Sequence, residues 1–306
     1  MTAEITHIPV LLEPSIELLE IHPGDIVVDG TYGGGGHSGA MIDAYKDITL
    51  ICTDLDEAAQ GRFDKRFGKQ SDRTLNVHFV HANFKDAEQI MQQVGVTTVN
   101  KVLLDLGTST FQLLSDERGF SFQSDTPLAM TFSQAGSHTG FTAFDIVNEW
   151  REESIADIVY NYGEEPKSRI IAGAIVEARK LAPILTSRQL AEVIESVVPQ
   201  RNRPFGQGKR IHPATKTFQA LRIAVNDELA VITEALDNWW KHLAPGGRIA
   251  VITFHSLEDR VVKRWMADKT PNKRVITKKV ITPSEEALQE NKRARSAKLR
   301  VVEKEQ

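Results

Sequence analysis

The feature of this sequence that most constrains its fold is an alternation of short apolar runs with helical stretches. The apolar runs have the length and composition of strands that are buried on both faces of a sheet. They are Asp25–Asp29, Thr49–Asp54, Val77–His81, Lys101–Asp105 and Arg248–Phe254. Helical patterns lie between the early runs, at Ser38–Lys46, Glu57–Phe67 and Lys85–Val94. Because a helix between neighbouring parallel strands makes a right-handed crossover, this alternation predicts a doubly wound α/β fold.

The alternation stops after Asp105, and the next strand pattern comes only at Arg248. A long helical pattern from about Thr215 to Leu243 precedes that strand and would be its crossover. The segment between is too long for a loop. It has helical patterns of its own, at Ala143–Tyr160, Pro166–Leu181 and Ser187–Val197. We therefore expect a Rossmann-like domain of residues 1–109 and 212–306, with a mostly helical domain inserted at residues 110–211.

The end of the chain returns to a strand pattern at Arg274–Thr282 and Lys298–Glu303, which predicts an antiparallel hairpin at the sheet edge.

The N-terminal residues lack the pattern of a signal peptide, and no apolar run is long enough to cross a bilayer. We therefore expect a cytoplasmic protein that does not bind membranes. The single cysteine, Cys52, excludes an internal disulfide framework and a cysteine-rich zinc site. No His, Asp or Glu cluster has metal-ligand spacing, so no required metal is expected.

Charge is distributed unevenly along the chain. Residues 260–306 carry 14 Lys or Arg and 6 Asp or Glu, although the whole chain has a net charge of −4. A second basic stretch, Pro199–Arg222, has no acidic residue. Basic side chains can contact phosphates and an aromatic ring can stack on a base, so RNA is a candidate partner. The candidate contacts are Arg201, Arg203, Phe205, Lys209 and Arg210, with a second surface at Lys292, Arg293, Arg295 and Lys298. The alternative is that both stretches are solvated surface, with Phe218 in the core.

A glycine-rich loop follows the first predicted strand. It consists of Gly33, Gly34, Gly35 and Gly36, followed by His37. Glycines at this place let a ligand approach the backbone. Asp54 ends the second strand, where a carboxylate can accept hydrogen bonds from the ribose hydroxyls of NAD or of S-adenosylmethionine. The alternative role for Asp54 is a cap on the following helix.

Three features favour S-adenosylmethionine. Asp29 precedes the glycines, where it can orient the loop or face the sulfonium. A Pro-Gly-Gly turn, residues 245–247, leads into the last long strand. Asp105 ends the fourth strand, over the point where a methyl group would be transferred. These features predict a methyltransferase, and a nicotinamide dehydrogenase is the rival that the fold alone leaves open.

Seven stretches of the chain are similar to one known family. They are His7–Glu13, Asp29–Ser38, Leu104–Gln112, Glu117–Phe122, His212–Glu228, Ile252–Lys263 and Arg295–Val301. On these motifs the chain resembles the ribosomal RNA small-subunit methyltransferase H family, also called MraW. The resemblance implies an S-adenosylmethionine-dependent methyltransferase that acts on N4 of a cytidine in small-subunit (16S) ribosomal RNA. The small ribosomal subunit would then be the partner, and a homodimer is left open.

The resemblance also implies roles for individual residues. The residues that would contact the cofactor through the glycine loop are Gly35, Gly36 and His37. Asp54 would bind the ribose, and Phe84 would lie against the adenine. The methionine side would be closed by Asp105 and Gln112.

The sequence departs from the family pattern at two places. Ala129 and Thr131 stand where the family has an acidic and a basic residue, and Ser109-Thr110-Phe111 replaces Ser-Ser-Pro. The departures leave two alternatives open: a small-molecule methyltransferase, or an adenosylmethionine-binding ribosome assembly factor without catalysis.

Chemistry selects the catalytic candidates. An exocyclic amine is a poor nucleophile, and a nearby acceptor can orient it and take its proton. Asp105 is the candidate for this role and Ser109 its helper. Methylation at C5 of a pyrimidine needs a cysteine nucleophile, and Cys52 lies inside a predicted strand, so amine or hydroxyl methylation remains. His255 could line the base pocket, unless the segment His255-Ser256 only caps the next helix through Ser256.

Overall fold

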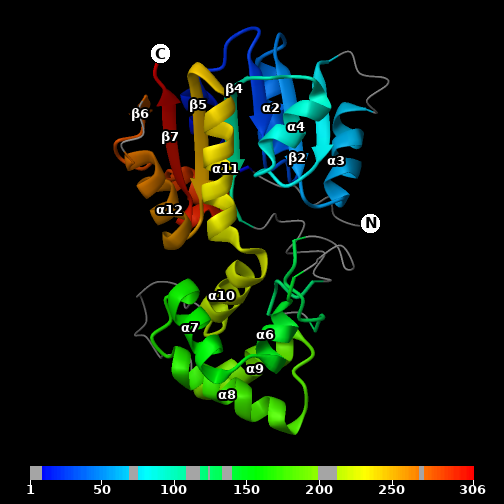
Figure 1. The fold of residues 1–306 in the computed structure, drawn as a ribbon, viewed down its shortest axis with the longest axis vertical. Coiled ribbons are helices and arrows are strands. Elements are labelled where there is room, and N and C mark those ends of the chain that lie inside the picture. The colour runs from blue at the N-terminus through cyan, green and yellow to red at the C-terminus, as the bar shows by residue number, and fades with distance from the viewer. Residues whose placement is uncertain are drawn as a thin grey trace. The chain divides into compact units, whose positions relative to one another are not determined.

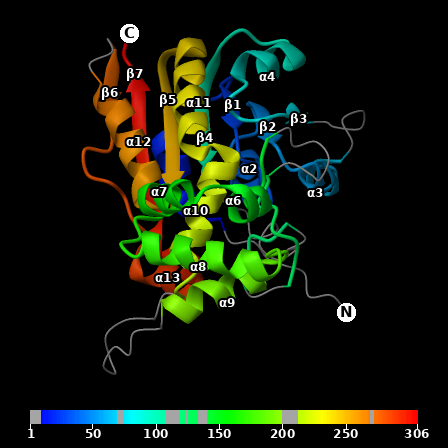
Figure 2. The ribbon, with the colours of Figure 1, turned by 60° about the horizontal axis from the view of Figure 1, so that its bottom comes forward.

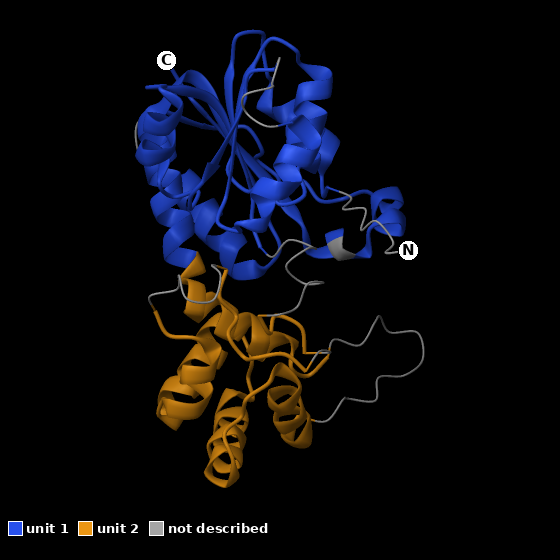
Figure 3. Cartoon of the chain, turned by 90° about the vertical axis from the view of Figure 1, so that its right-hand side faces the viewer, with its two compact units in different colours: residues 1–111, 229–306 blue, residues 112–228 orange. Residues whose placement is uncertain are grey.

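The computed structural model describes residues 9–68, 75–107, 118–122, 125–132, 140–198, 212–268 and 272–306. The chain forms two compact units (Figure 3). Unit 1 comprises residues 1–111 and 229–306, and unit 2 comprises residues 112–228. The second unit therefore ends at Glu228, later in the chain than the predicted boundary at residue 211.

Unit 1 is built on a seven-stranded sheet in the part of the chain that the structure describes (Figure 1). The strands are β1 (Ile26–Asp29), β2 (Thr49–Asp54), β3 (Val77–His81), β4 (Val99–Asp105), β5 (Leu243–Thr253), β6 (Lys273–Val275) and β7 (Lys298–Lys304). Their order across the sheet is β3-β2-β1-β4-β5-β7-β6. The first five strands pair in parallel, whereas β7 pairs antiparallel with both β5 and β6. The prediction of a doubly wound α/β fold is confirmed.

The helices of unit 1 cover both faces of this sheet. They are α1 (Leu12–Leu19), α2 (Gly36–Ala44), α3 (Ala58–Phe67), α4 (Ala87–Val94), α11 (Glu228–His242), α12 (Ser256–Ala267), α13 (Glu285–Glu290) and the 3-10 helix η2 (Lys292–Ser296). Side chains of α1, α2 and α3 share one core cluster with Val27, Leu50 and Leu103, and those of α4, α11 and α12 share another with Val28, Ile51 and Leu104. Figures 1 and 2 both show α11 alongside β5. Consecutive strand residues point to opposite faces, so burial on both faces explains the continuous apolar runs.

The predicted antiparallel pair of C-terminal strands at the sheet edge is confirmed, but its first strand, β6, is shorter than the predicted Arg274–Thr282. The longer strand β7 lies inside the sheet, between β5 and β6, and only the short β6 lies at the edge. Leu299 and Val301 of β7 are fully buried, which is why the pattern of this strand was clear in the sequence. Among the described residues, no helix combines the length and the apolar character that crossing a bilayer requires.

Unit 2 contains the helices α6 (Ala143–Glu149), α7 (Glu152–Gly163), α8 (Ser168–Leu181), α9 (Ser187–Val197) and α10 (Thr215–Asn226). Buried side chains from all five helices form one core. Helix α10 contributes Phe218, Leu221 and Val225 to it, which places this helix in unit 2 and explains the later boundary. The assignment of Phe218 to the core is confirmed.

The prediction of one long helix from Thr215 to Leu243 was wrong, because the helix breaks at Asp227. Asp227 has a left-handed backbone with φ of 47°, a conformation that Asp and Asn tolerate better than most residues. The preceding residue, Asn226, explains the position of the break. Its side chain donates to the carbonyl of Met130 at 2.8 Å and accepts from the amide of Phe132 at 2.9 Å. The helix therefore ends where its last side chain is tied to a distant loop.

The pattern at Ala143–Tyr160 likewise forms two helices, α6 and α7. The chain is extended at Trp150 and Arg151, between the two. The guanidinium of Arg179 donates to the carbonyls of Val147 at 2.8 Å and of Trp150 at 2.6 Å. A long-range partner thus satisfies carbonyls that would otherwise lack one at the end of α6.

Candidate active site

The glycine loop leads from β1 into α2, and two of its residues need the freedom of glycine. Gly33 and Gly35 have φ of 53° and 73°, in the left-handed region that side chains disfavour. A Cβ atom on Gly35 would also collide with the hydroxyl of Tyr32. Tyr32 is buried, and its amide donates to the carbonyl of Thr53 at 3.0 Å. The loop is therefore held close to the end of β2.

Asp54, at the end of β2, bonds to the glycine loop directly. Its Oδ2 accepts from the amide of Gly33 at 2.7 Å, and its Oδ1 accepts from the amide of Asp56 at 2.8 Å. Burial raises the pKa of Asp54, and the two amide hydrogen bonds oppose that rise. The alternative role as a helix cap is wrong, because the N-cap of α3 is Glu57. Each carboxylate oxygen keeps a second lone pair for a ligand.

Asp29 orients the loop. Its carboxylate accepts from the Ser38 hydroxyl at 2.6 Å and from the Thr31 amide at 3.2 Å, and burial raises its pKa. The side chain of Thr31 bonds to the end of β4, because its Oγ1 accepts from the amide of Asp105 at 2.7 Å. The ends of β1 and β4 are thereby joined beside the glycines.

Asp105 lies at the end of β4, and its carboxylate is buried with little compensation. The side chain is 16% exposed, and Oδ1 has no hydrogen-bond partner among the described residues. Burial raises the pKa of Asp105 well above its usual value, and the nearby carboxylates of Asp29 and Glu258 raise it further. An acceptor with a raised pKa and an open lone pair is suited to hold or take a proton.

Phe84 follows β3, and its partly buried side chain packs against the core cluster that α4, α11 and α12 share. A Cβ atom on Gly30 would lie 3.1 Å from the Cβ of Phe84, so the two backbones approach closely. The carbonyl of Phe84 accepts from the indole of Trp239, on α11, at 2.7 Å. Phe84 is thus fixed at the carboxyl edge of the sheet, where ligands bind in this fold.

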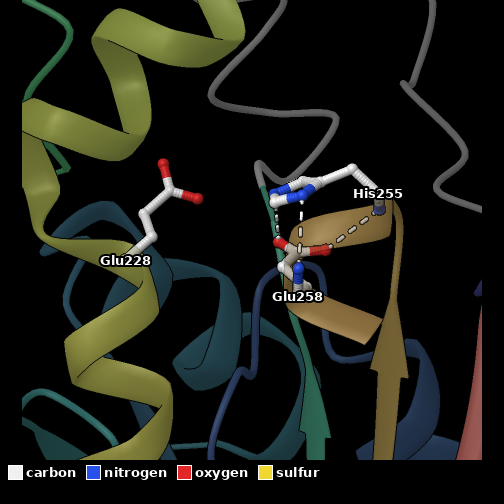
Figure 4. Close-up of side chains that lie close together, drawn as sticks. All are labelled: Glu228, His255 and Glu258. Carbon is white, nitrogen blue, oxygen red and sulfur yellow. Dashed lines mark hydrogen bonds and ion pairs between the residues drawn. The ribbon is translucent and has the colours of Figure 1, made fainter. Parts of the chain in front are cut away.

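His255 lies two residues after the end of β5, the strand that pairs with β4, and it caps α12. Nδ1 of its ring accepts from the amide of Glu258 at 3.4 Å, and Oε2 of Glu258 accepts from the amides of Phe254 at 2.7 Å and His255 at 3.2 Å. Figure 4 shows this pair, together with Glu228 at the start of α11. The alternative that Ser256 caps this helix is wrong, because the cap is His255 and the reciprocal partner is Glu258.

Several predicted site residues lie outside the described residues. They are Ser109, Gln112, Arg201, Arg203, Phe205, Lys209 and Arg210. Two other cations of the basic stretch have partners within unit 2. Arg222 forms two hydrogen bonds with Glu228, at 2.7 and 2.9 Å, and Lys216 donates to the carbonyl of Glu164 at 2.8 Å. In the tail, Lys298 is paired with Asp259 at 3.1 Å, whereas Lys292 and Arg295 are exposed.

The two substituted motif positions lie in unit 2. Thr131 is 3% exposed, and its neighbour Met130 is 1% exposed with φ of 58°. The carbonyl of Ala129 accepts from the amide of Ala143, the first residue of α6, at 2.9 Å. These positions therefore belong to a buried turn that holds α6.

Four residues that position the site were not predicted from the sequence: Arg62, Trp239, Thr31 and Glu258. Arg62, on α3, donates to the carbonyl of Gly33 at 2.8 Å and to Asp56 at 3.0 Å. Trp239 and Thr31 hold Phe84 and Asp105 as described above. Glu258 had a signal in the sequence, since it stands three residues after the cap, where a capping box has its Glu. Arg62, Trp239 and Thr31 had none.

The acceptor groups at the carboxyl edge of the sheet fit S-adenosylmethionine. This cofactor carries a sulfonium, an ammonium and two ribose hydroxyls, all of which attract acceptors. The carboxyl ends of β2 and β4 supply the carboxylates of Asp54 and Asp105, and Oδ1 of Asp105 is buried without a partner in the described chain.

The chain is similar along almost its whole length to proteins of one known family. The family model for the MraW methylase family matches residues 4–305. The ribosomal RNA small subunit methyltransferase H of Brevibacillus brevis is 44% identical over 321 residues and covers 99% of each chain. The protein of the same name from Nostoc punctiforme is 44% identical, over 98% of this chain and 94% of its own. Among solved structures, an rRNA methylase from Streptococcus thermophilus covers 98% of this chain and 100% of its own, with 12% identity and a TM-score of 0.44. The chain belongs to the MraW methylase family.

Proposed function

We propose that this protein transfers a methyl group from S-adenosylmethionine to N4 of a cytidine in small-subunit ribosomal RNA. The structural observation that carries the proposal is the buried carboxylate of Asp105, whose Oδ1 has no partner in the described chain. The relatives, which share 40–44% identity with this chain, are named ribosomal RNA small subunit methyltransferase H, and these names support the choice of ribosomal RNA. The action would take place in the cytoplasm, and a homodimer is compatible with it.

The cofactor contacts follow from the geometry of the loop. We assign backbone contacts to Gly33, Gly34, Gly35, Gly36 and His37. Asp54 would accept from the ribose hydroxyls through the lone pairs that its two amide bonds leave open. Phe84 would lie against the adenine, and Gln112 would close the methionine side with Asp105. S-adenosylmethionine, when bound, supplies a methyl group that its sulfonium activates.

The chain's own residues have to manage the proton of the amine. As the nitrogen of the base gains the methyl group, it loses one hydrogen as a proton, and Oδ1 of Asp105 is the acceptor that we assign to it, with Ser109 as helper. The raised pKa of Asp105 brings this carboxylate closer to the acidity that suits a base near neutral pH. Lowering the pH should therefore slow the transfer as Asp105 becomes protonated.

RNA recognition is assigned to basic and aromatic groups. The phosphates would be contacted by four basic side chains, those of Arg201, Arg203, Lys209 and Arg210. Phe205 would stack on a base, and His255 would line the base pocket. A base paired within the RNA would have to be turned out to reach Asp105. The helical unit 2 would serve substrate recognition.

The test is mass spectrometry of small-subunit ribosomal RNA nucleosides from a strain that lacks the gene. We expect N4-methylated cytidine to be lost, and to return with the wild-type gene but not with an Asp105→Asn variant. Unchanged nucleosides in the deletion strain would overturn the proposal. Label from radioactive methyl donor in a metabolite, without label in RNA, would instead show a small-molecule methyltransferase.

A further inference from the structure

We propose that His255 offers its Nε2–H group as a hydrogen-bond donor to the target base, and that Glu258 is the positioning residue that fixes the ring in this state. The inference rests on the proposed function, because it concerns how the same site reads its base. It assigns recognition to His255 and leaves the proton to Asp105.

The capping bond determines which ring nitrogen carries hydrogen. A backbone amide can only donate, so Nδ1 of His255 must be the acceptor when it bonds to the amide of Glu258. In a neutral imidazole one nitrogen is a donor and the other an acceptor, and the hydrogen must then be on Nε2. The N-cap position therefore selects the tautomer that has a donor at the far end of the ring.

Glu258 holds this arrangement from below. The side chain is 1% exposed, and its Oε2 is anchored by the amides of Phe254 and His255. Its Oε1 lies 3.1 Å from Nε2 of His255 (Figure 4). A carboxylate at this distance favours the tautomer in which Nε2 carries the hydrogen, because an Nε2 lone pair would face a negative charge. The approach lies off the line of a hydrogen bond, so Nε2 has no aligned partner among the described residues.

An unsatisfied donor in a buried position is unusual. The side chain of His255 is 10% exposed, and leaving a buried donor without an acceptor costs about 1–3 kcal/mol. Such a group in a native structure calls for an explanation, and a ligand that supplies the missing acceptor is one. The site of this donor is the carboxyl edge of the sheet.

The neighbouring strand presents the complementary group. β4 and β5 are paired with Asp105 opposite Ile252, and the amide of Leu106 donates to the carbonyl of Ile252 at 2.9 Å. The charge of Glu258 contributes to the raised pKa of Asp105, as expected for groups at adjacent strand ends. Among the described residues, neither Oδ1 of Asp105 nor Nε2 of His255 has a hydrogen-bond partner of good geometry, and the two residues lie at the carboxyl ends of adjacent strands.

This pairing of donor and acceptor fits the edge of a base that presents an amine beside a ring acceptor. Cytosine has such an edge, with the N4 amine next to the unprotonated N3. Uracil has the reverse arrangement, with a carbonyl next to an N–H, and would place like groups against like. Sites that hydrogen-bond their substrate reject an analogue that leaves buried groups unpaired. His255 would therefore help to exclude uridine.

The experiment separates the cap from the donor. Asn and Ser are favoured N-cap residues, so His255→Asn and His255→Ser keep an acceptor for the amide of Glu258 but remove the Nε2 donor. We expect both variants to melt within a few degrees of the wild type and to bind S-adenosylmethionine normally. Their kcat/KM for methyl transfer to small ribosomal subunits from the deletion strain should fall about 10- to 100-fold, the loss expected for one hydrogen bond in a closed site.

The positioning role of Glu258 is tested by measuring which ring nitrogen of His255 carries the hydrogen. In wild-type protein, the nitrogen NMR shifts of His255 should show hydrogen on Nε2, and Glu258→Gln should change them. Glu258→Gln should also slow transfer in the wild-type background but add little to His255→Asn, since the two residues act as one unit. A purely structural role would instead give losses that add.

The outcomes distinguish the two proposals. If the wild type does not methylate small subunits from the deletion strain, the proposed function fails and this inference fails with it. If the wild type is active and the well-folded His255→Asn and His255→Ser variants keep the full rate, only this inference is overturned. Hydrogen on Nδ1 in the NMR spectrum would overturn it as well.

Discussion

Oδ2 of Asp105 lies 3.8 Å from Nδ1 of His37, yet these two residues do not form an ion pair. Burial lowers the pKa of His37 to about 4, and its Nε2 donates to the carbonyl of Val10 at 3.2 Å. Near neutral pH the ring is therefore neutral, and its unprotonated Nδ1 faces the carboxylate. Asp105 gains no counter-charge from this neighbour, which agrees with its raised pKa.

Asp105→Asn should stabilise the protein while abolishing transfer. A carboxyl group whose pKa is raised on folding binds its proton more tightly in the folded state. Stability is therefore lost as the pH rises from the unfolded value of 3.8 through the folded pKa. Removing the charge should raise the free energy of unfolding at pH 7 by about 1–3 kcal/mol. Urea denaturation measures it, and the difference between variant and wild type should shrink toward pH 4. A less stable variant at pH 7 would contradict the argument.

Asp54→Ala should weaken binding of S-adenosylmethionine by about 1–3 kcal/mol, because the ribose hydroxyls lose a charged acceptor. Titration calorimetry of the two proteins measures the change. Asp43→Ala is the control, since Asp43 is an exposed carboxylate on α2 of the same unit and should leave the affinity unchanged. Equal affinities for Asp54→Ala and wild type would remove Asp54 from the cofactor site.

Replacing Arg201, Arg203, Lys209 and Arg210 with Ala should flatten the salt dependence of RNA binding. Each phosphate contact contributes about 0.7–0.9 to the slope of log affinity against log salt, because counterions are released. The affinity for S-adenosylmethionine should hardly change. A second variant, Lys292→Ala with Arg295→Ala, ranks the exposed tail against this segment. An unchanged slope in both variants would mean that the two basic stretches are solvated surface.

Two glycines of unit 2 should respond oppositely to alanine. A Cβ atom on Gly163, in α7, would lie 2.6 Å from the carbonyl oxygen of Lys216, in α10, and neither backbone can yield easily. Gly163→Ala should therefore cost about 1–3 kcal/mol of stability. A Cβ atom on Gly173, in α8, would meet only the Glu152 side chain, at 3.5 Å. Gly173→Ala should stabilise by about 0.5–1 kcal/mol, through helix propensity. Thermal unfolding compares both variants with the wild type.

The sheet could be read from the sequence because strands buried on both faces leave continuous apolar runs. β2 and β3 begin and end at the predicted residues, Thr49–Asp54 and Val77–His81. The break at Asp227 could not be predicted. It depends on a hydrogen bond from Asn226 to Met130, 96 positions earlier in the chain, and periodicity carries no trace of such a contact.

The residues of the candidate site likewise fall into those that could be predicted from the sequence and those that could not. Asp54 and Asp105 could be proposed because strand ends and glycine loops have fixed places in this fold. The residues that hold the site in place could not be predicted, since Trp239 donates to the carbonyl of Phe84, a residue 155 positions away in the chain. The cap at His255 was missed because the acceptor role of a histidine depends on its tautomer, which no residue pattern records.

The position of β7 inside the sheet has a consequence for how the chain folds as it is synthesised. β5 can pair with β4 as soon as it is made, but its other edge is completed only by β7. The 45 positions between Thr253 and Lys298 take about 2–9 s to translate at 5–20 residues per second. During that interval the nascent chain carries an open apolar strand edge, the kind of surface that chaperones cover and that leads to aggregation. Synthesis of the last strand is therefore the step that ends this exposure.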